Sequence, residues 1–279
     1  MNEYFRPTEI PDALEALARQ PLMVVAGGTD FYPARVGKPL DEDILDVSAL
    51  FGLKQIQETK QDFRIGARVT WTDVIRTDLP AYFDGLKQAA VTVGGVQTQN
   101  AGTLCGNICN ASPAADSVPN LLALNAQVEL SSTSGIRTLP LDEFILGNRQ
   151  TARRPEELVT GLVIPKPSGQ ARSSFEKLGA RRYLVISIVM VGAVMALDEN
   201  GRIKDLRVAV GACSPVARRL TALEQEMLGK PVSELTVTPE HCAGLSPIDD
   251  VRARASYRDE VVPTLVKRAI LKMTERSET

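Results

Sequence analysis

The chain has 279 residues, of which 44% are hydrophobic and 24% are charged, and 32 basic residues nearly balance 34 acidic ones. This composition is typical of a soluble globular protein large enough for more than one lobe, and it excludes a disordered chain. The near-neutral charge, without a basic block, argues against nucleic acid or an anionic membrane as a partner.

The N-terminus has neither the basic start nor the apolar run of a signal peptide, and no stretch approaches 18 unbroken apolar residues. The most apolar run, Tyr183 to Leu197, is too short for a membrane helix and fits a buried strand. We therefore expect a cytoplasmic protein without membrane insertion.

In the first half of the chain, the predicted helices and strands alternate. Thr8 can cap a first helix, whose apolar face consists of Ile10, Ala13, Leu14 and Leu17. A buried strand at 22–26 ends at paired glycines, and further strands are expected at 43–48 and 62–67. Helices follow at 71–77 and 82–91, and the stretch 126–141 predicts a hairpin that turns near Ser134 and Gly135.

The second half has a different pattern. Two long strands joined at Asn200 and Gly201 precede helices at 215–228 and at about 259–273. The stretch 164–174, between the halves, is rich in Pro, Gly and Ser. We therefore place a domain boundary near residue 170 of an α+β protein.

The four cysteines form no CxxC pair, and the single histidine, His241, has no second metal-ligand pair nearby. We therefore predict no metal site. A lone histidine also argues against a hydrolase triad, so we expect no catalytic side chain and a cofactor that carries the chemistry.

Two glycine-rich loops are the candidate cofactor site. In the first, "VVAGGTD", a strand runs into paired glycines, whose missing Cβ lets backbone amides approach an anion such as a dinucleotide pyrophosphate. The second, "NAGTLCGNICNASPAAD", offers small hydrogen-bonding groups and ends at Asp116, an acceptor suited to sugar hydroxyls. The alternatives for these features are an ordinary tight turn, a set of Asx turns and, for Asp116, a helix cap. The G-x-G-x-x-G fingerprint is absent from both loops, which argues against a Rossmann fold.

These two loops together, "VVAGGTD" and "QNAGTLCGNICNASPAADSVPNLLALNAQVEL", resemble the FAD-binding (medium, flavoprotein) subunits of the molybdenum hydroxylases, the xanthine dehydrogenase and carbon monoxide dehydrogenase family. "SSFEKLGARRYLVISIVMVGA" and "ASYRDEVVPTLVKRAIL" extend the resemblance over essentially the whole chain. It implies a two-lobed FAD-binding domain of the type shared with vanillyl-alcohol-oxidase-like flavoproteins at 1–169, with subdomains at about 1–55 and 56–169. A smaller α/β C-terminal domain with an antiparallel sheet and helices is expected at 170–279.

The resemblance also implies a set of FAD-binding residues. The matching positions are Ala26, Gly27, Gly28, Thr29 and Asp30 in the first loop, Gly102, Thr103, Gly106, Asn107, Ser112 and Asp116 in the second, and Lys177 in the F-E-K-x-G stretch. Lys177 is expected near the isoalloxazine, with a solvated lysine on an edge strand as the alternative. The chain departs from most members at Cys105, where they have glycine, and near Ile188, where animal xanthine dehydrogenases have a lysine beside the flavin.

By the same resemblance, this subunit passes electrons from the [2Fe–2S] clusters of a small subunit through FAD to NAD or another acceptor. Molybdopterin is expected on a large subunit, and the complex is expected as a dimer of heterotrimers. The departure near Ile188 argues against NAD. Two other functions stay open: a stand-alone FAD-dependent oxidoreductase of the same flavin fold, and a cofactor-free scaffold subunit.

Overall fold

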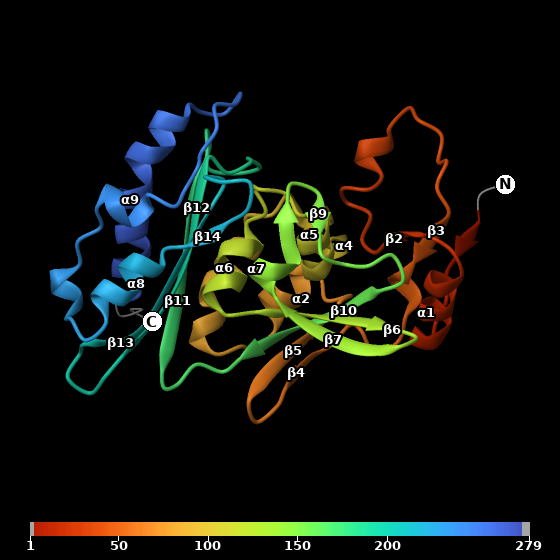
Figure 1. Ribbon diagram of the computed structural model, residues 1–279, viewed down its shortest axis with the longest axis horizontal. Coiled ribbons are helices and arrows are strands. Elements are labelled where there is room, and N and C mark those ends of the chain that lie inside the picture. Colours follow the sequence, from red (N-terminus) through yellow and green to blue (C-terminus); the bar gives the residue numbers. More distant parts are fainter. Residues whose placement is uncertain (1–2, 275–279) are drawn as a thin grey trace. The chain divides into compact units, whose positions relative to one another are not determined.

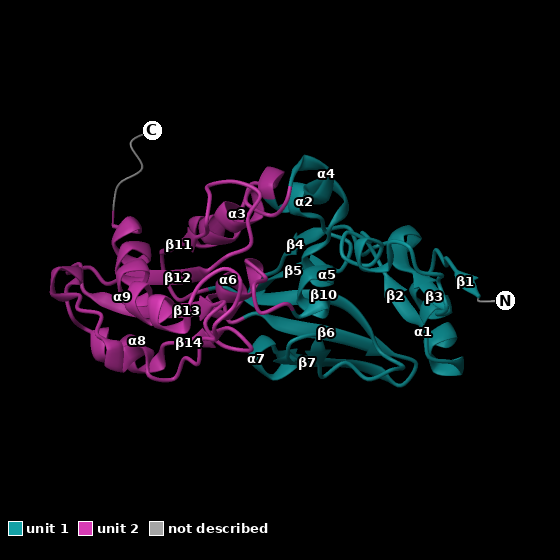
Figure 2. Cartoon of the chain, turned by 90° about the horizontal axis from the view of Figure 1, so that it is seen from above, with its two compact units in different colours: residues 1–74, 95–111, 126–166 teal, residues 75–94, 112–125, 167–279 magenta. Residues whose placement is uncertain are grey.

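The computed structural model describes residues 3–274. The ends of the two predicted domains, residues 1–2 and 275–279, lie outside the described residues. The chain folds into two compact units, coloured separately in Figure 2. Unit 1 comprises 1–74, 95–111 and 126–166, and unit 2 comprises 75–94, 112–125 and 167–279. Each unit is therefore assembled from separated stretches of the sequence.

Unit 1 begins with a small parallel sheet in the order β1 (Tyr4–Phe5), β3 (Ile44–Asp46), β2 (Met23–Val25). The connecting helix α1 (Ile10–Arg19) buries Ala13, Ala16 and Leu17, close to the predicted face. Its N-cap is Glu9, and no side chain caps it, so the predicted Thr8 cap is wrong. The Thr8 carbonyl instead accepts a hydrogen bond from Phe51 N (2.8 Å), which holds Thr8 outside the helix.

The second sheet of unit 1 is antiparallel and has five strands. Its order is β4 (Ile56–Glu58), β5 (Asp62–Gly66), β10 (Leu158–Pro165), β6 (Gln127–Ser132), β7 (Gly135–Pro140). Phe63 and Ile65 alternate into the core as predicted, and the predicted hairpin is present as β6 and β7. The smaller elements of the first half are η1 (Pro33–Arg35), η2 (Val47–Ala49), α2 (Trp71–Arg76), α4 (Val96–Ala101), α5 (Leu104–Asn110), α7 (Leu141–Phe144), β8 (Ile145–Gly147) and β9 (Gln150–Thr151).

Unit 2 is built on an antiparallel sheet in the order β11 (Ala171–Leu178), β12 (Val189–Leu197), β13 (Ile203–Gly211), β14 (Arg218–Arg219). Figure 1 shows α8 (Thr221–Met227) and α9 (Ala255–Lys272) on one side of β12 and α6 (Ser117–Ala123) on the other. The remaining elements are η3 (Ala81–Phe83), α3 (Asp84–Ala90), η4 (Val232–Glu234) and η5 (Pro239–Cys242). Because both faces are covered, β12 is buried along nearly its whole length.

Helix α6 lies directly on the sheet because two glycines leave room for it. A Cβ on Gly192 would lie 2.6 Å from Asn120 N, and one on Gly211 would lie 2.9 Å from Pro119 Cγ. Every residue of α6 is buried, including Asn120, whose Nδ2 donates to the Asp116 carbonyl at 3.0 Å. The close approach fixes the start of α6, and with it Asp116.

Two predicted elements differ from the structure. The apolar run from Tyr183 does not extend as a strand, because Leu184 adopts a left-handed conformation (φ 50°), and β12 begins only at Val189. The helix predicted at 215–228 is confined to α8, because Arg218 and Arg219 pair with β13 as an edge strand. Between residues 3 and 274, no helix combines the length and the apolar character needed to cross a bilayer.

Candidate functional site

The first glycine-rich loop follows β2 in unit 1. Within residues 3–274, no backbone carbonyl accepts a hydrogen bond from the amides of Gly27, Gly28 or Thr29, and these residues are only half-buried. Gly28 adopts a left-handed conformation (φ 67°), which turns the chain sharply. The carbonyls of Gly28 and Asp30 accept from Tyr32 N and Ala34 N, so they are occupied by the turn that follows. The loop therefore offers three amide donors, as an anion site requires.

The first loop and the start of the second loop are in contact within unit 1. A Cβ on Gly27 would lie 1.9 Å from the carbonyl oxygen of Ala101. A Cβ on Gly102 would lie 3.2 Å from Thr29 Oγ1. Glycine at 27 is thus required for the packing of one loop on the other, and glycine at 102 leaves room for the Thr98 carbonyl oxygen, which would lie 2.9 Å from a Cβ there.

The second loop turns into α5 at Thr103. Thr103 Oγ1 accepts a hydrogen bond from Gly106 N at 3.0 Å, and the Thr103 carbonyl accepts from Asn107 N. A Cβ on Gly106 would lie 2.7 Å from the same hydroxyl, so Gly106 keeps the cap in place. Cys105 lies within α5 with its side chain buried, and this burial strongly raises the pKa of its thiol. The helix therefore accommodates a side chain at the position where the resemblance led us to expect glycine.

The other predicted cofactor residues belong to unit 2. Ser112 is half-buried, and its Oγ accepts from Ala114 N at 3.3 Å in a short turn. Asp116 and Lys177 form an ion pair, with Asp116 Oδ2 at 2.6 Å from Lys177 Nζ. The structure thus places nine of the twelve predicted residues in unit 1 and three, Ser112, Asp116 and Lys177, in unit 2.

Asp116 is the centre of a largely buried polar group that we call the Asp116 cluster, made of Thr92, Asp116, Lys177 and Ser187. Asp116 Oδ1 accepts from Ser187 Oγ at 2.5 Å, and Oδ2 lies 3.3 Å from Thr92 Oγ1 as well as bonding Lys177. The side chains of Asp116 and Lys177 are only 7% and 12% exposed. Both carboxylate oxygens are therefore occupied by partners within unit 2.

This geometry decides two alternatives left open by the sequence. Asp116 is at the N-cap position of α6, but its side chain makes no capping hydrogen bond, so the helix-cap interpretation is wrong. Lys177 does lie on the edge strand β11, yet its side chain is only 12% exposed and is paired with Asp116, so the solvated-lysine interpretation is also wrong. A carboxylate buried to this extent needs a charged or hydrogen-bonding partner, and Lys177 and Ser187 provide both.

Sequence reasoning missed Thr92 and Ser187. A usable signal existed for Ser187, because it is a lone hydroxyl inside an otherwise apolar run, where a polar group must find a partner. Thr92 gave no comparable signal, since it follows a predicted helix as an ordinary polar residue. Among the described residues, no group of three His, Cys, Asp or Glu side chains could hold a metal ion.

The sequence matches two family descriptions. Residues 1–167 match the FAD binding domain in molybdopterin dehydrogenase, and residues 174–273 match the CO dehydrogenase flavoprotein C-terminal domain. These matches define the class of protein, a FAD-binding subunit of an oxidoreductase. The chain belongs to the FAD-binding medium subunits of the molybdenum hydroxylase family, of the xanthine and carbon monoxide dehydrogenase type.

Relatives cover nearly the whole chain. The caffeine dehydrogenase subunit beta of Pseudomonas sp. (strain CBB1) is 29% identical, with 98% of this chain and 95% of the relative covered. The putative xanthine dehydrogenase FAD-binding subunit XdhB of Escherichia coli is 28% identical, with 96% and 94% covered. The solved structure of carbon monoxide dehydrogenase from Hydrogenophaga pseudoflava contains a chain with a TM-score of 0.87 and 26% identity, over 98% of this chain and 97% of that one. The names of these relatives mark them as parts of oxidoreductases, the first two as subunits.

Proposed function

We propose that this chain is the electron-transfer subunit of a multi-subunit molybdenum hydroxylase, which passes electrons from a partner subunit through FAD to an acceptor. The observation that carries the proposal is the first loop of unit 1. The amides of Gly27, Gly28 and Thr29, which donate to no backbone carbonyl in the part of the chain that the structure describes, lie in a turn that packs against Ala101 and Gly102. Such a turn suits the pyrophosphate of FAD, because several amides can donate to it at once.

The residues around this turn fit the cofactor in distinct ways. Ala26 and Asp30 bound the turn, and we propose that they line the pyrophosphate site with its three amides. Thr103 and Gly106 are proposed to hold the second loop in shape, since their side chain and amide bond each other. Asn107 and Ser112 are proposed as small polar contacts to the nucleotide.

In unit 2, we propose that Lys177 presents its charge toward the flavin ring. Asp116 would then act through Lys177 as a positioning residue, because both of its oxygens are occupied by Thr92, Lys177 and Ser187. FAD, when bound, supplies the ability to take up single electrons and release them in pairs. No described side chain has to act as a general acid or base in such a function.

The partners and cellular setting follow the same proposal. We propose a large molybdopterin subunit, a small subunit with [2Fe–2S] clusters, and assembly as a dimer of heterotrimers in the cytoplasm. The acceptor would be NAD or another oxidant. We also propose that residues 1–169 form the FAD-binding domain, with subdomains at about 1–55 and 56–169, related in fold to vanillyl-alcohol-oxidase-like flavoproteins. Residues 170–279 would form the C-terminal domain.

The test is a visible absorption spectrum of the purified chain, followed by release and chromatography of any bound nucleotide. We expect flavin absorption bands and released FAD. A folded protein that stays colourless after incubation with FAD would overturn the proposal and favour a cofactor-free scaffold. Steady turnover of a small alcohol by the isolated flavoprotein would instead favour a stand-alone oxidoreductase.

A further inference from the structure

A buried arginine joins helix α9 to two other segments of unit 2. The side chain of Arg258 is only 2% exposed, so its charge needs several hydrogen-bond partners. Its Nε donates to the Ile188 carbonyl at 3.1 Å, just before β12. Its Nη1 donates to the Ile248 carbonyl, and its Nη2 donates to Asp250 Oδ1 at 2.9 Å, both in the segment that leads into α9. A planar guanidinium can make such bonds side by side, whereas a lysine has a single nitrogen.

The bond from Arg258 Nε reaches the part of the sheet that carries Lys177. The amide of Ile188 donates to the Leu178 carbonyl at 2.7 Å, and Leu178 directly follows Lys177 on β11. Ser187 directly precedes Ile188. The backbone of Ile188 is therefore held from two sides, by Arg258 through its carbonyl and by β11 through its amide.

Ser187 connects this backbone to the Asp116 cluster. Ser187 is 2% exposed, and its Oγ donates to Asp116 Oδ1 at 2.5 Å. Asp116 Oδ2 accepts from Lys177 Nζ at 2.6 Å. Hydrogen bonds weaken steeply when donor and acceptor move out of line, so the Ser187 backbone has to be held in place. The Ile188 carbonyl belongs to the next residue, so the bond from Arg258 acts close to that point.

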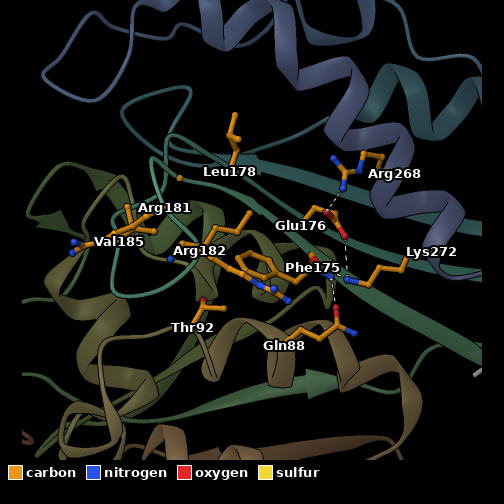
Figure 3. A pocket seen from close by; sticks show the side chains of 12 residues that line it. Gln88, Thr92, Phe175, Glu176, Leu178, Arg181, Arg182, Val185, Arg268 and Lys272 are labelled. Atoms are coloured by element: carbon orange, nitrogen blue, oxygen red, sulfur yellow. Dashed lines mark hydrogen bonds and ion pairs between the residues drawn. The ribbon is translucent and has the colours of Figure 1, made fainter. Parts of the chain in front are cut away.

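The loop before Ser187 has few buried side chains to hold it. Tyr183, Leu184 and Ile186 are 55%, 47% and 53% exposed. Figure 3 shows Arg181 and other side chains of this loop beside a cavity, and Thr92 and Lys177 of the Asp116 cluster also line that cavity. The loop therefore depends on the contacts at its end, where Ser187 and Ile188 become buried.

We propose that Arg258 is a positioning residue for Lys177. It holds the Ile188 backbone and, through Ser187 and Asp116, fixes the direction of the Lys177 ammonium group. The proposal rests on the proposed function in one respect, because Lys177 is there proposed to present its charge toward the flavin ring. A fixed positive charge beside the ring favours the reduced flavin, so Arg258 would raise the reduction potential of bound FAD.

A purely structural role of Arg258 makes a different prediction, and two control variants separate the two roles. Arg252 Nη1 donates to Asp250 Oδ2 at 2.9 Å, so Arg252→Gln removes another arginine from the same carboxylate. Val266 is fully buried on α9, so Val266→Ala lowers the stability of the fold without removing a hydrogen bond of Ile188. If Arg258 only stabilises the fold, these controls should affect Lys177 in proportion to their loss of stability.

The first experiment uses the full chain prepared without FAD. Its lysines are acylated with N-hydroxysuccinimidyl acetate, and the rate at Lys177 is read by peptide mass spectrometry, with the exposed Lys204 as the reference in the same sample. Arg258→Met is expected to raise the rate at Lys177 about tenfold relative to Lys204, because the cluster opens more often when one hydrogen bond to a charged group is lost. Arg252→Gln and Val266→Ala should leave the rate unchanged.

A more conservative variant guards against misfolding of Arg258→Met. In Arg258→Lys the ammonium group is expected to stay with Asp250, since the buried charges attract each other, and Ile188 then loses its donor. The rate at Lys177 should therefore rise in this variant too. Thermal unfolding of every variant shows which of them are folded.

The second experiment measures the reduction potential of FAD bound to the same variants. We expect a lower potential in Arg258→Met and Arg258→Lys, and an unchanged potential in Arg252→Gln and Val266→Ala. The shift should have the same direction as that of Lys177→Met, because both changes take a fixed charge away from the ring.

Three outcomes would overturn the proposal. The first is an unchanged acylation rate at Lys177 in folded Arg258→Met or Arg258→Lys. The second is an equal rise in Val266→Ala at the same loss of stability, which would show a structural role only. The third is faster acylation with an unchanged potential, which would exclude an effect on the flavin. A chain that binds no FAD would instead overturn the proposed function, and the acylation rates would still decide whether Arg258 positions Lys177.

Discussion

Gly27 and Ala101 lie so close that a Cβ on Gly27 would be 1.9 Å from the Ala101 carbonyl oxygen. This contact joins the two glycine-rich loops of unit 1, which are far apart in the sequence. The obstacle is backbone, and backbone cannot rotate away as a flexible side chain can. The absence of a Cβ at Gly27 is therefore needed for the packing of the two loops, whether or not a ligand is bound.

The first prediction concerns this contact. Gly27→Ala should lower the free energy of unfolding by about 3 kcal/mol and reduce FAD content, because the loops must move apart. Gly244→Ala is the control, since a Cβ there meets nothing within 4 Å, and it should change stability by less than about 0.5 kcal/mol. Denaturant unfolding and FAD content per chain are the measurements. Equal stability of the two variants would contradict the close contact.

The second prediction concerns Gly28. Gly28→Val should lower the free energy of unfolding by roughly 1–3 kcal/mol. A β-branched residue rarely adopts the left-handed conformation, and its Cβ would lie 2.5 Å from the Tyr32 ring. The same change places methyl groups beside the free amides of the first loop, so FAD should be lost. A second substitution, Tyr32→Ala, should recover part of the stability and none of the FAD. Full FAD occupancy in folded Gly28→Val would show that the first loop does not bind the pyrophosphate.

The third prediction concerns the Asp116 cluster. Asp116→Ala leaves the part-buried Lys177 without its partner, which should lower the free energy of unfolding by about 2 kcal/mol and weaken FAD binding. The double variant Asp116→Leu with Lys177→Met should recover stability, because an apolar pair can replace a buried ion pair, but not FAD affinity. Fluorescence titration and denaturant unfolding separate the two effects. Normal FAD affinity in the double variant would exclude any role of the cluster in flavin binding.

The fourth prediction is a pH dependence in the C-terminal part of unit 2. Burial raises the pKa of Asp250, but hydrogen bonds from the Arg252 amide, the Arg258 guanidinium and the Ala253 amide outweigh it and hold the pKa well below its usual range. Because the folded-state pKa is lowered, the carboxylate stabilises the fold at neutral pH. This stabilisation is lost as the pH falls below the ordinary aspartate pKa of about 4.

The test compares Asp250→Asn with the unsubstituted chain. The variant should be less stable by roughly 2 kcal/mol near pH 7, because Arg258, whose side chain is 2% exposed, loses its ion pair. The difference in stability between the two proteins should become smaller as the pH is lowered from about 5 to about 3. Thermal unfolding across that range is the measurement, and a constant difference in stability would mean that the pKa of Asp250 is not lowered in the folded chain.

The sequence pattern predicted the elements whose structure depends on residues close together in the chain. The hairpin of β6 and β7 follows from alternating apolar residues and the turn before Gly135, and β12 and β13 follow from long apolar strands around Asn200 and Gly201. The helix boundaries were less predictable. Arg218 and Arg219 read as helix in the sequence, yet they pair with β13, because an edge strand gains its partners only when the sheet exists.

For the candidate site, the sequence by itself determined which loops we propose for it, because paired glycines after a strand and a loop of small polar residues indicate backbone that another group approaches closely. Only the tertiary structure showed why residue 27 has to be glycine. It also showed that Asp116 binds Lys177 and that Ser187 belongs to the same cluster. It also decided that the expected strand does not begin at Tyr183, because Leu184 adopts a left-handed conformation and β12 begins only at Val189. The physical reason is distance along the chain. Propensity and periodicity act between near neighbours, whereas the partners of Gly27 and Asp116 are brought together only by packing.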